Sequence, residues 1–242
     1  MLLPTLKPNL AMSLNWKEID KILSEIPLEE SLIQKIKQPD FTSLVIDLFN
    51  KTDRFPLYIC LAQNQTRLHR LTRKVENTVQ LQRFAQILRS RIKGARITAA
   101  YQVHGDRIIK LHLSRGDVES VLWIRFWSNA ANIILTEPDG LILDAFYRRP
   151  KRGEKSGGNF NPESQPDIGK KLTSSKTYEV RHLPGEGDFN QRVEAYYFDS
   201  HESRKLEQFG EQLQKGIERE EGRLLAALEK AQRHNSNGDR VA

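Results

Sequence analysis

Cysteine and long apolar runs are scarce in this chain of 242 residues. A single cysteine, Cys60, excludes a disulfide scaffold and any zinc or iron–sulfur site built from several cysteines. No run approaches the ~18–20 apolar residues that span a bilayer, so we expect no membrane association. The hydrophobic fraction of 38% is below that of an average globular chain, which indicates that part of the chain is solvated.

The first residues resemble a signal peptide only briefly. Pro4 and Pro8 interrupt the apolar run, no basic segment precedes it, and no small-residue cleavage site follows. Met12 is an alternative start of translation. Together with the free cysteine, these features favour a cytoplasmic protein.

Positive charge is concentrated in the first part of the chain. The net charge is +7 and the pI is about 9.5. Residues 1–150 hold 22 Lys and Arg against 15 Asp and Glu, whereas residues 151–242 hold 16 of each. Within residues 51–100, basic residues are densest over residues 67–96, which have one acidic residue, Glu76, and nine basic ones: Arg67, Arg70, Arg73, Lys74, Arg83, Arg89, Arg91, Lys93 and Arg96.

This basic stretch has two interpretations. A solvated helix face is common, but such faces usually mix both signs, because opposite charges four residues apart support the helix. Cations without acidic neighbours remain available for phosphates, and we therefore favour a nucleic acid as the partner.

The periodicity of apolar residues predicts an α+β fold. Helical spacing occurs over residues 14–26 and 80–93, with Gly94 as the C-terminal cap of the second helix. Turn sequences such as His104-Gly105-Asp106 separate short β-rich runs. The predicted strands are residues 42–49, 57–62, 96–103, 107–113, 121–126, 132–136 and 141–145. The last five follow one another, which is typical of an antiparallel meander packed with helices.

Three segments are predicted along the chain. Residues 13–148 form the folded domain, and residues 149–188, rich in Gly, Pro, Ser and charge, have linker composition. Residues 189–234 return to helical spacing on a charged background, as in one helix of a coiled coil. We expect this helix to need a partner, either a missing second helix of the coiled coil or another chain.

An ordered set of motifs resembles a known family. RLHRLTRK (67–74), LQRFAQILRSRIKGARI (81–97), HGDRIIKLHL (104–113) and NIILTEPDGLILDA (132–145) occur in the order found in the NFACT-N domain. QPD (38–40) has a similar counterpart there. This domain opens the ribosome quality-control proteins once called fibronectin-binding protein A. Its fold is similar to the N-terminal domain of formamidopyrimidine-type DNA glycosylases.

The resemblance implies a non-enzymatic RNA-binding factor without a cofactor. Such proteins bind the stalled large ribosomal subunit and recruit tRNA for C-terminal tailing of the nascent chain. Other members continue through a helix-hairpin-helix module, a coiled-coil hairpin and a second RNA-binding domain. We expect this chain to be a shortened member that supplies the first module and one coil arm.

The resemblance also implies the site residues. Asp106 and Arg107 match an Asp-Arg pair that the family needs for tailing and associates with tRNA recruitment. From the residues alone, Gly105-Asp106 is a good hairpin turn in which the aspartate caps backbone amides. Further candidates for RNA backbone contacts are Arg67, Arg89, Arg91 and Arg96, for which ordinary surface charge is the alternative. Trp123 and Trp127 fit core packing better than base stacking.

Two other functions remain open. A glycosylase-like enzyme would use an N-terminal proline followed by glutamate, which neither Met1 nor Met12 introduces. A surface fibronectin-binding adhesin is the second alternative. The six histidines show no metal-ligand spacing and no catalytic triad pattern, so we expect neither a metal nor a catalytic residue.

Overall fold

A computed structural model describes residues 13–75, 80–164 and 177–238. The chain divides into a compact unit that ends at Tyr196 and a second unit that begins at Tyr197. The helices are α1 (Trp16–Glu25), α2 (Arg83–Ile92) and α3 (Phe189–Gly238), with short 3-10 helices η1 (Pro150–Arg152) and η2 (Pro162–Ser164). The strands are β1 (Leu32–Lys37), β2 (Ser43–Asn50), β3 (Asp53–Cys60), β4 (Arg67–Arg70), β5 (Arg96–Gln102), β6 (Ile108–Arg115), β7 (Val118–Arg125), β8 (Asn132–Thr136) and β9 (Ile142–Ala145).

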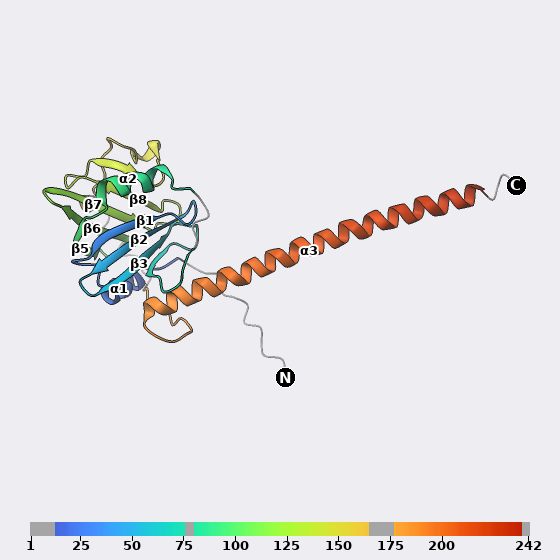
Figure 1. Ribbon diagram of the computed structural model, residues 1–242, viewed down its shortest axis with the longest axis horizontal. Coiled ribbons are helices and arrows are strands. Elements are labelled where there is room, and N and C mark those ends of the chain that lie inside the picture. Colours follow the sequence, from blue (N-terminus) through green and yellow to red (C-terminus); the bar gives the residue numbers. More distant parts are fainter. Residues whose placement is uncertain (1–12, 76–79, 165–176, 239–242) are drawn as a thin grey trace. The chain divides into compact units, whose positions relative to one another are not determined.

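All nine strands of the first unit form one antiparallel sheet (Figure 1). The order is β4-β3-β2-β1-β5-β6-β7-β8-β9, so β1 joins the meander of β2 to β4 to the meander of β5 to β9. Each meander comes from hairpins between consecutive strands, which need only short turns. The predicted α+β class and its closing antiparallel meander are confirmed.

The sheet curls so that strands far apart in its order meet the same helix. Helix α1 packs against both β4 and β5, and α2 packs against both β1 and β9. The curl also brings the start of β4 to the end of β7, where the Thr66 hydroxyl donates to the Phe126 carbonyl over 3.4 Å. The two helices thus close the sheet around its apolar interior.

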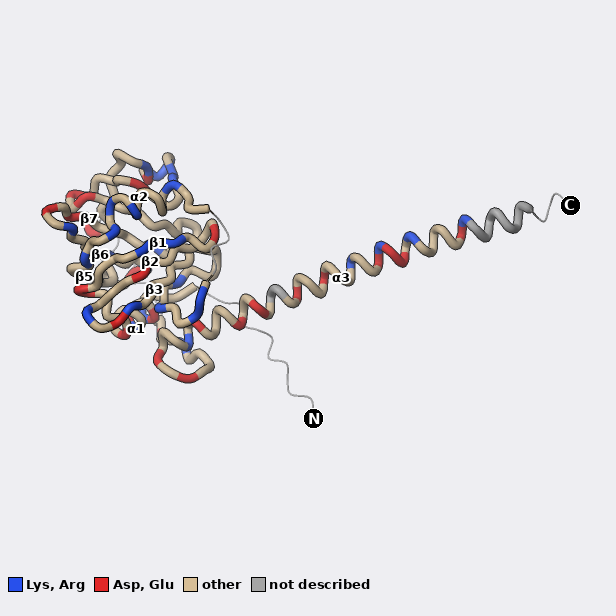
Figure 2. Tube along the Cα trace, in the orientation of Figure 1, with Lys and Arg blue, Asp and Glu red and all other residues tan. Residues whose placement is uncertain are grey.

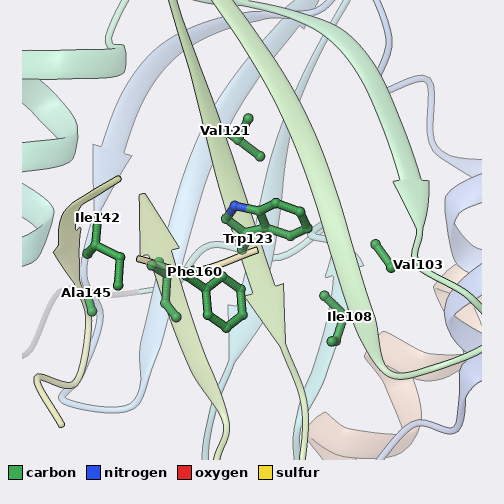
Figure 3. Packing of buried hydrophobic residues seen from close by; sticks show 8 residues of the cluster. Val103, Ile108, Val121, Trp123, Ile142, Ala145 and Phe160 are labelled. Atoms are coloured by element: carbon green, nitrogen blue, oxygen red, sulfur yellow. The ribbon is translucent and has the colours of Figure 1, made fainter. Parts of the chain in front are cut away.

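One apolar cluster fills the interior between β6, β7, β8 and β9 (Figure 3). Trp123 lies at its centre, with its ring 5.6 Å from that of Phe160 in an edge-on contact. The Trp123 indole N–H donates to the Thr136 hydroxyl over 3.1 Å, which satisfies a buried donor. Trp123 is 3% exposed, so core packing is its role, as predicted.

The two predicted helices of the domain are confirmed. Asn15 caps α1, because its side chain accepts from the Glu18 amide while the Glu18 carboxylate accepts from the Asn15 amide. Helix α2 ends before Gly94, whose φ of 83° is the left-handed conformation that favours glycine.

Two strands were absent from the sequence prediction. β1 has a register shift between Ile33 and Lys35. β4 holds four residues of the basic stretch, for which a solvated helix face was one interpretation. β3 begins at Asp53, so only Lys51 and Thr52 remain of the longer turn expected before Pro56. Short strands with charged residues carry too little apolar alternation to be recognised.

Described residues of the segment predicted as a linker, 149–188, belong to the first unit and contact the rest of it at several points. The amide of Phe160 donates to the Gly140 carbonyl, and the amide of Ile142 donates to the Gly158 carbonyl. These bonds cover the edge of β9. Farther along, the Arg181 guanidinium binds the buried Glu18 carboxylate at 2.5 Å. The Gly and Pro residues of this segment therefore form turns, while a few side chains attach it to the rest of the unit. Residues 165–176 lie outside the described residues.

The helical period predicted from residue 189 is confirmed as a single helix of 50 residues. In the second unit, large apolar side chains of α3 are exposed: Leu206, Phe209, Leu213, Ile217, Leu224, Leu225 and Leu228. Pairing of this face with a second helix stays a prediction.

Candidate nucleic-acid interface

A tight turn between β5 and β6 presents the two residues of the predicted Asp-Arg pair. The Asp106 amide donates to the Val103 carbonyl over 3.0 Å and closes the turn. His104 and Gly105 both have positive φ, of 50° and 64°. Positive φ at both central positions is typical of the type I′ turn, whose twist suits a hairpin. The predicted turn is confirmed.

The Asp106 carboxylate fixes the corner formed by this turn. One of its oxygens accepts from the backbone amide of Arg107 at 2.7 Å. The Trp127 indole N–H lies 3.0 Å from both oxygens and donates to the carboxylate. Asp106 therefore positions its neighbour and a tryptophan that follows β7, which extends the capping role expected from turn chemistry.

The Arg107 guanidinium has no carboxylate within ion-pair distance in the described part of the chain. Its side chain is half-buried, and its nearest polar contact is the Ser128 hydroxyl at 3.4 Å from Nη2. Within residues 13–75, 80–164 and 177–238, no carboxylate forms an ion pair with Arg107. The Asp106 carboxylate, next to it in sequence, accepts hydrogen bonds from the Trp127 indole and the Arg107 backbone amide. A guanidinium in this state can bind an anion without breaking an internal ion pair.

Trp127 connects the corner to a buried polar network. The Arg125 guanidinium lies 4.8 Å from the Trp127 ring and binds Glu154 at 2.6 Å. The other Glu154 oxygen accepts from the Asn132 amide at 2.7 Å. Asn132 is fully buried and also holds the backbone of Tyr147 through both its donor and its acceptor.

Charge in this network is not balanced. Burial is the main influence on Arg125 and lowers the pKa of its guanidinium, while Glu154 acts in the opposite direction. The guanidiniums of Arg149 and Arg152 lower the pKa of Arg125 further by repulsion. Three guanidiniums, those of Arg125, Arg149 and Arg152, therefore lie around the one carboxylate of Glu154.

The other predicted arginines do not join Asp106 and Arg107. Arg89, Arg91 and Arg96 lie around the start of β5, whereas the corner follows its end, about 20 Å away along seven strand residues. Arg96 pairs with Glu30 at 3.1 Å, and the Nε of Arg89 donates to the Ile36 carbonyl at 3.0 Å. The first contact ties the start of β5 to the segment before β1, and the second ties α2 to β1.

Arg91 is exposed beside a mixed-charge cavity of about 760 Å³. Arg115 also lines this cavity, but so do three acidic residues: Asp117, Glu119 and Glu137. An anion would meet at least as much negative as positive charge there. Arg91 is therefore a weaker candidate for a phosphate contact than its place in the sequence indicates.

Arg67 requires a correction, because it is 9% exposed. Its guanidinium lies 5.2 Å from the Tyr58 ring, and Nη1 donates to the Gln65 carbonyl over 2.9 Å. The side chain packs inside the domain because β4 turns it towards the sheet. A bound RNA would meet little of it.

The sequence prediction missed a second group of cations, in residues 148–155. These eight residues hold five basic side chains and one acidic, Glu154, which is buried. The loop, yellow beside α2 in Figure 1, carries a group of Lys and Arg segments in Figure 2. A local charge count identifies this group, whereas the Gly- and Pro-rich composition of the segment indicates a linker.

A family profile described as NFACT N-terminal and middle domains matches residues 18–156. The chain belongs to this family. The resemblance seen in the ordered motifs is thereby confirmed. The matched NFACT segment includes the Asp106–Arg107 corner and the cations of residues 148–155.

Three solved structures share the fold of this NFACT domain. The N-terminal part of the fibronectin/fibrinogen-binding protein from Streptococcus suis has a TM-score of 0.58 and 21% identity, covering 63% of this chain and 62% of that one. The fibrinogen-binding protein from Staphylococcus aureus gives 0.56 and 19%, covering 63% and 57%. The N-terminal domain of fibronectin-binding protein PavA from Streptococcus pneumoniae gives 0.57 and 24%, covering 64% and 66%.

These identities show a common fold and nothing finer. The matched region spans less than two thirds of each of the three structures. No curated protein matches the chain. Within the described residues, no three His, Cys, Asp or Glu side chains are grouped to hold a metal ion. The described helices include none with the length and apolar character needed to cross a membrane.

Proposed function

We propose that this NFACT domain is a non-enzymatic RNA-binding module that joins tRNA to the stalled large ribosomal subunit in the cytoplasm. The observation that carries the proposal is the Arg107 guanidinium, which forms no ion pair among the described residues and extends from a hydrogen-bonded turn. Asp106 contributes by fixing the backbone of Arg107 and the ring of Trp127. A planar guanidinium fork matches the oxygens of a phosphate.

The corner is suited to binding because little of it must be ordered when a ligand arrives. The type I′ turn, the Asp106 carboxylate and the Trp127 ring hold one another before binding. Gln102 adds a further tie, since its side-chain oxygen accepts from the Gly105 amide at 3.0 Å. Preorganisation of this kind lowers the entropy cost of association.

The test is recovery of tRNA with large ribosomal subunits and direct binding of unfractionated tRNA. We expect Arg107→Ala to weaken tRNA binding by about ten- to a hundredfold, since a charged hydrogen bond contributes about 1.5–3 kcal/mol. Asp106→Ala should give a similar loss through mispositioning. The control is Arg54→Ala, which removes an exposed arginine on β3.

Equal recovery of tRNA by wild type, Arg107→Ala and Asp106→Ala would refute the assignment. Thermal unfolding of each variant shows whether the domain is still folded. Arg107→Lys, which keeps the charge but loses the planar fork, should give an intermediate affinity.

Fibronectin binding is the second candidate, because the similar solved structures are named for fibronectin or fibrinogen binding. Salt distinguishes the two functions. A phosphate-driven complex weakens steeply between low and moderate salt, since each neutralised phosphate releases counterions. Fibronectin binding that is unaffected by Arg107→Ala and nearly independent of salt would favour the adhesin.

A further inference from the structure

Residues 148–155 form a closed loop, here called the arm, whose shape is set by backbone hydrogen bonds. The Arg149 amide donates to the Glu154 carbonyl, and the Glu154 amide donates back to the Arg149 carbonyl, at 2.9 and 3.2 Å. Gly153 ends the 3-10 turn with a φ of 71°, which glycine adopts readily. The side chains of the arm therefore project from a defined backbone.

Buried contacts anchor the arm on both sides. Glu154 is 3% exposed and binds Arg125 and Asn132, as described above. After the arm, Phe160 inserts into the apolar cluster around Trp123 (Figure 3). A Cβ at Gly158 would overlap the Gly153 carbonyl oxygen, so the return of the chain depends on a glycine there.

The few carboxylates near the arm are each shared by two cations. Asp144, fully buried, forms ion pairs with both Arg83 and Arg148. Burial and then repulsion from Arg148 lower the pKa of Arg83, which agrees with their closeness. Glu154 in the same way serves Arg125 at 2.6 Å and Arg149 at 3.9 Å. Each carboxylate thus leaves one positive charge uncompensated.

Three further cations of the arm have no such partner. Lys151, Arg152 and Lys155 are exposed, and none forms an ion pair with a carboxylate in the described part of the chain. They add to the surplus left by the shared pairs. The arm is therefore a concentrated positive surface on a rigid support, and such a surface attracts polyanions.

We propose that the arm is a second RNA-backbone contact, linked to the Asp106–Arg107 corner through Trp127, Arg125 and Glu154. This inference takes RNA as the polyanion from the proposed function. It adds the residues that contact the RNA phosphates. The corner and the arm share one buried network, so one nucleic acid can meet both. The arm supplies sequence-independent affinity, because side chains that contact phosphates carry no base information.

RNA suits the arm better than an anionic membrane does. The sequence RRPKRGEK contains no apolar side chain larger than proline, whereas surface-bound loops and helices insert apolar residues below the headgroups. Arginine, which supplies three of the five cations, binds phosphate oxygens in a bidentate manner.

The test measures how binding of a labelled 12-nucleotide oligouridylate and of unfractionated tRNA depends on salt. The arm variant is Lys151→Gln, Arg152→Gln and Lys155→Gln, which breaks no ion pair. Its matched control is Lys35→Gln, Lys51→Gln and Arg54→Gln, three exposed cations elsewhere with the same change in net charge. Both are made in the full chain, and thermal unfolding checks that each is folded.

We expect the arm variant to lose at least tenfold in affinity for both RNAs at low salt. Its slope of log affinity against log salt should fall by roughly two, since each phosphate contact contributes about 0.7–0.9. The control should keep the wild-type slope within error. Equal losses in the arm variant and the control would mean a general effect of net charge and would overturn the proposal.

The remaining outcomes separate this inference from the proposed function. An arm variant with wild-type slopes, alongside weak tRNA binding by Arg107→Ala, overturns the arm and leaves the function standing. Arm-dependent binding of oligouridylate without any recovery of tRNA on large subunits supports the arm and overturns the function. Arm-dependent binding to phosphatidylserine vesicles, with RNA binding unchanged, replaces RNA by a membrane and overturns the inference.

Discussion

Two arginine-rich segments of this domain use their charge in opposite ways. In the basic stretch of residues 67–96, arginines hold the fold together: Arg67 lies over Tyr58, Arg70 pairs with Asp53 at 2.8 Å, and Arg96 pairs with Glu30. In the arm of residues 148–155, the exposed Lys151, Arg152 and Lys155 have no ion-pair partner in the described part of the chain. The longer basic stretch, with nine basic residues among 30, therefore makes more internal contacts with its arginines than the short arm, with five among eight, makes with Lys151, Arg152 and Lys155.

The difference comes from where the backbone places each side chain. Strand β4 pairs with β3, so Arg67 and Arg70 meet aromatic rings and an acidic residue across the strands. The arm is a turn that projects from the sheet edge, and its single acidic residue points inward as an anchor. Charge density in a sequence indicates an interface only when the fold supplies no acceptors of its own.

The largest expected effect is the loss of the inward anchor of the arm. Glu154→Ala should lower the free energy of unfolding by about 3–5 kcal/mol, because it leaves the buried Arg125 guanidinium without its carboxylate. Denaturant unfolding of wild type and variant measures the difference. Lys151→Ala, in the same loop but exposed, should change the stability by no more than about 0.5 kcal/mol.

A small effect of Glu154→Ala would show that the arm is held mainly by Phe160 and by backbone bonds. The contrast between an anchoring carboxylate and outward cations would then fail. The double variant Arg125→Met with Glu154→Leu sharpens the test, because replacing both charges by apolar groups should restore much of the stability lost by the single variant.

A middle-sized effect concerns the basic stretch and its buried histidine. Burial, and then the nearby Arg67 guanidinium, lower the pKa of His69 from 6.5 to about 3. In the unfolded chain the imidazole takes up a proton near pH 6.5, while in the folded domain it stays neutral until about pH 3. The stability that depends on neutral His69 is therefore complete above pH 6.5 and is lost as the pH falls.

Within that window the slope is about 1.4 kcal/mol per pH unit. We expect the free energy of unfolding of wild type to fall more steeply between pH 6 and 4 than that of His69→Gln, by about this amount per unit. Urea unfolding at several pH values measures both curves. Parallel curves would place the histidine, and with it this part of the stretch, outside the structural core.

The sequence allowed prediction of the regular parts of the fold. Strands β5 to β9 are short β-rich runs separated by turn residues such as His104-Gly105, so local chemistry is sufficient to define them. The helices α1 and α2 follow from their apolar spacing. The Asp106–Arg107 pair was found through the family resemblance, although its link to Trp127 depends on a hairpin contact between residues 21 positions apart.

The remaining features depend on contacts that no local pattern encodes. Strand β4 is four residues long and half of it is arginine, and only pairing with β3 makes it a strand. The arm has the composition of a linker, yet its backbone hydrogen bonds, the buried Glu154 and the Phe160 that follows it anchor it to the sheet. Whether an arginine is available also depends on distant partners, as Glu30 for Arg96 shows.

The smallest expected effect is at Arg96, which the sequence offered as an RNA contact. Arg96→Ala should lower the free energy of unfolding by less than about 1 kcal/mol, because exposed ion pairs contribute little. It should also leave the salt slope of tRNA binding unchanged, since Arg96 lies at the opposite end of β5 from the corner. A slope lower by about one would instead place RNA over both ends of β5. In that case the basic stretch and the arm would belong to one interface, and the contrast between them would be one of degree.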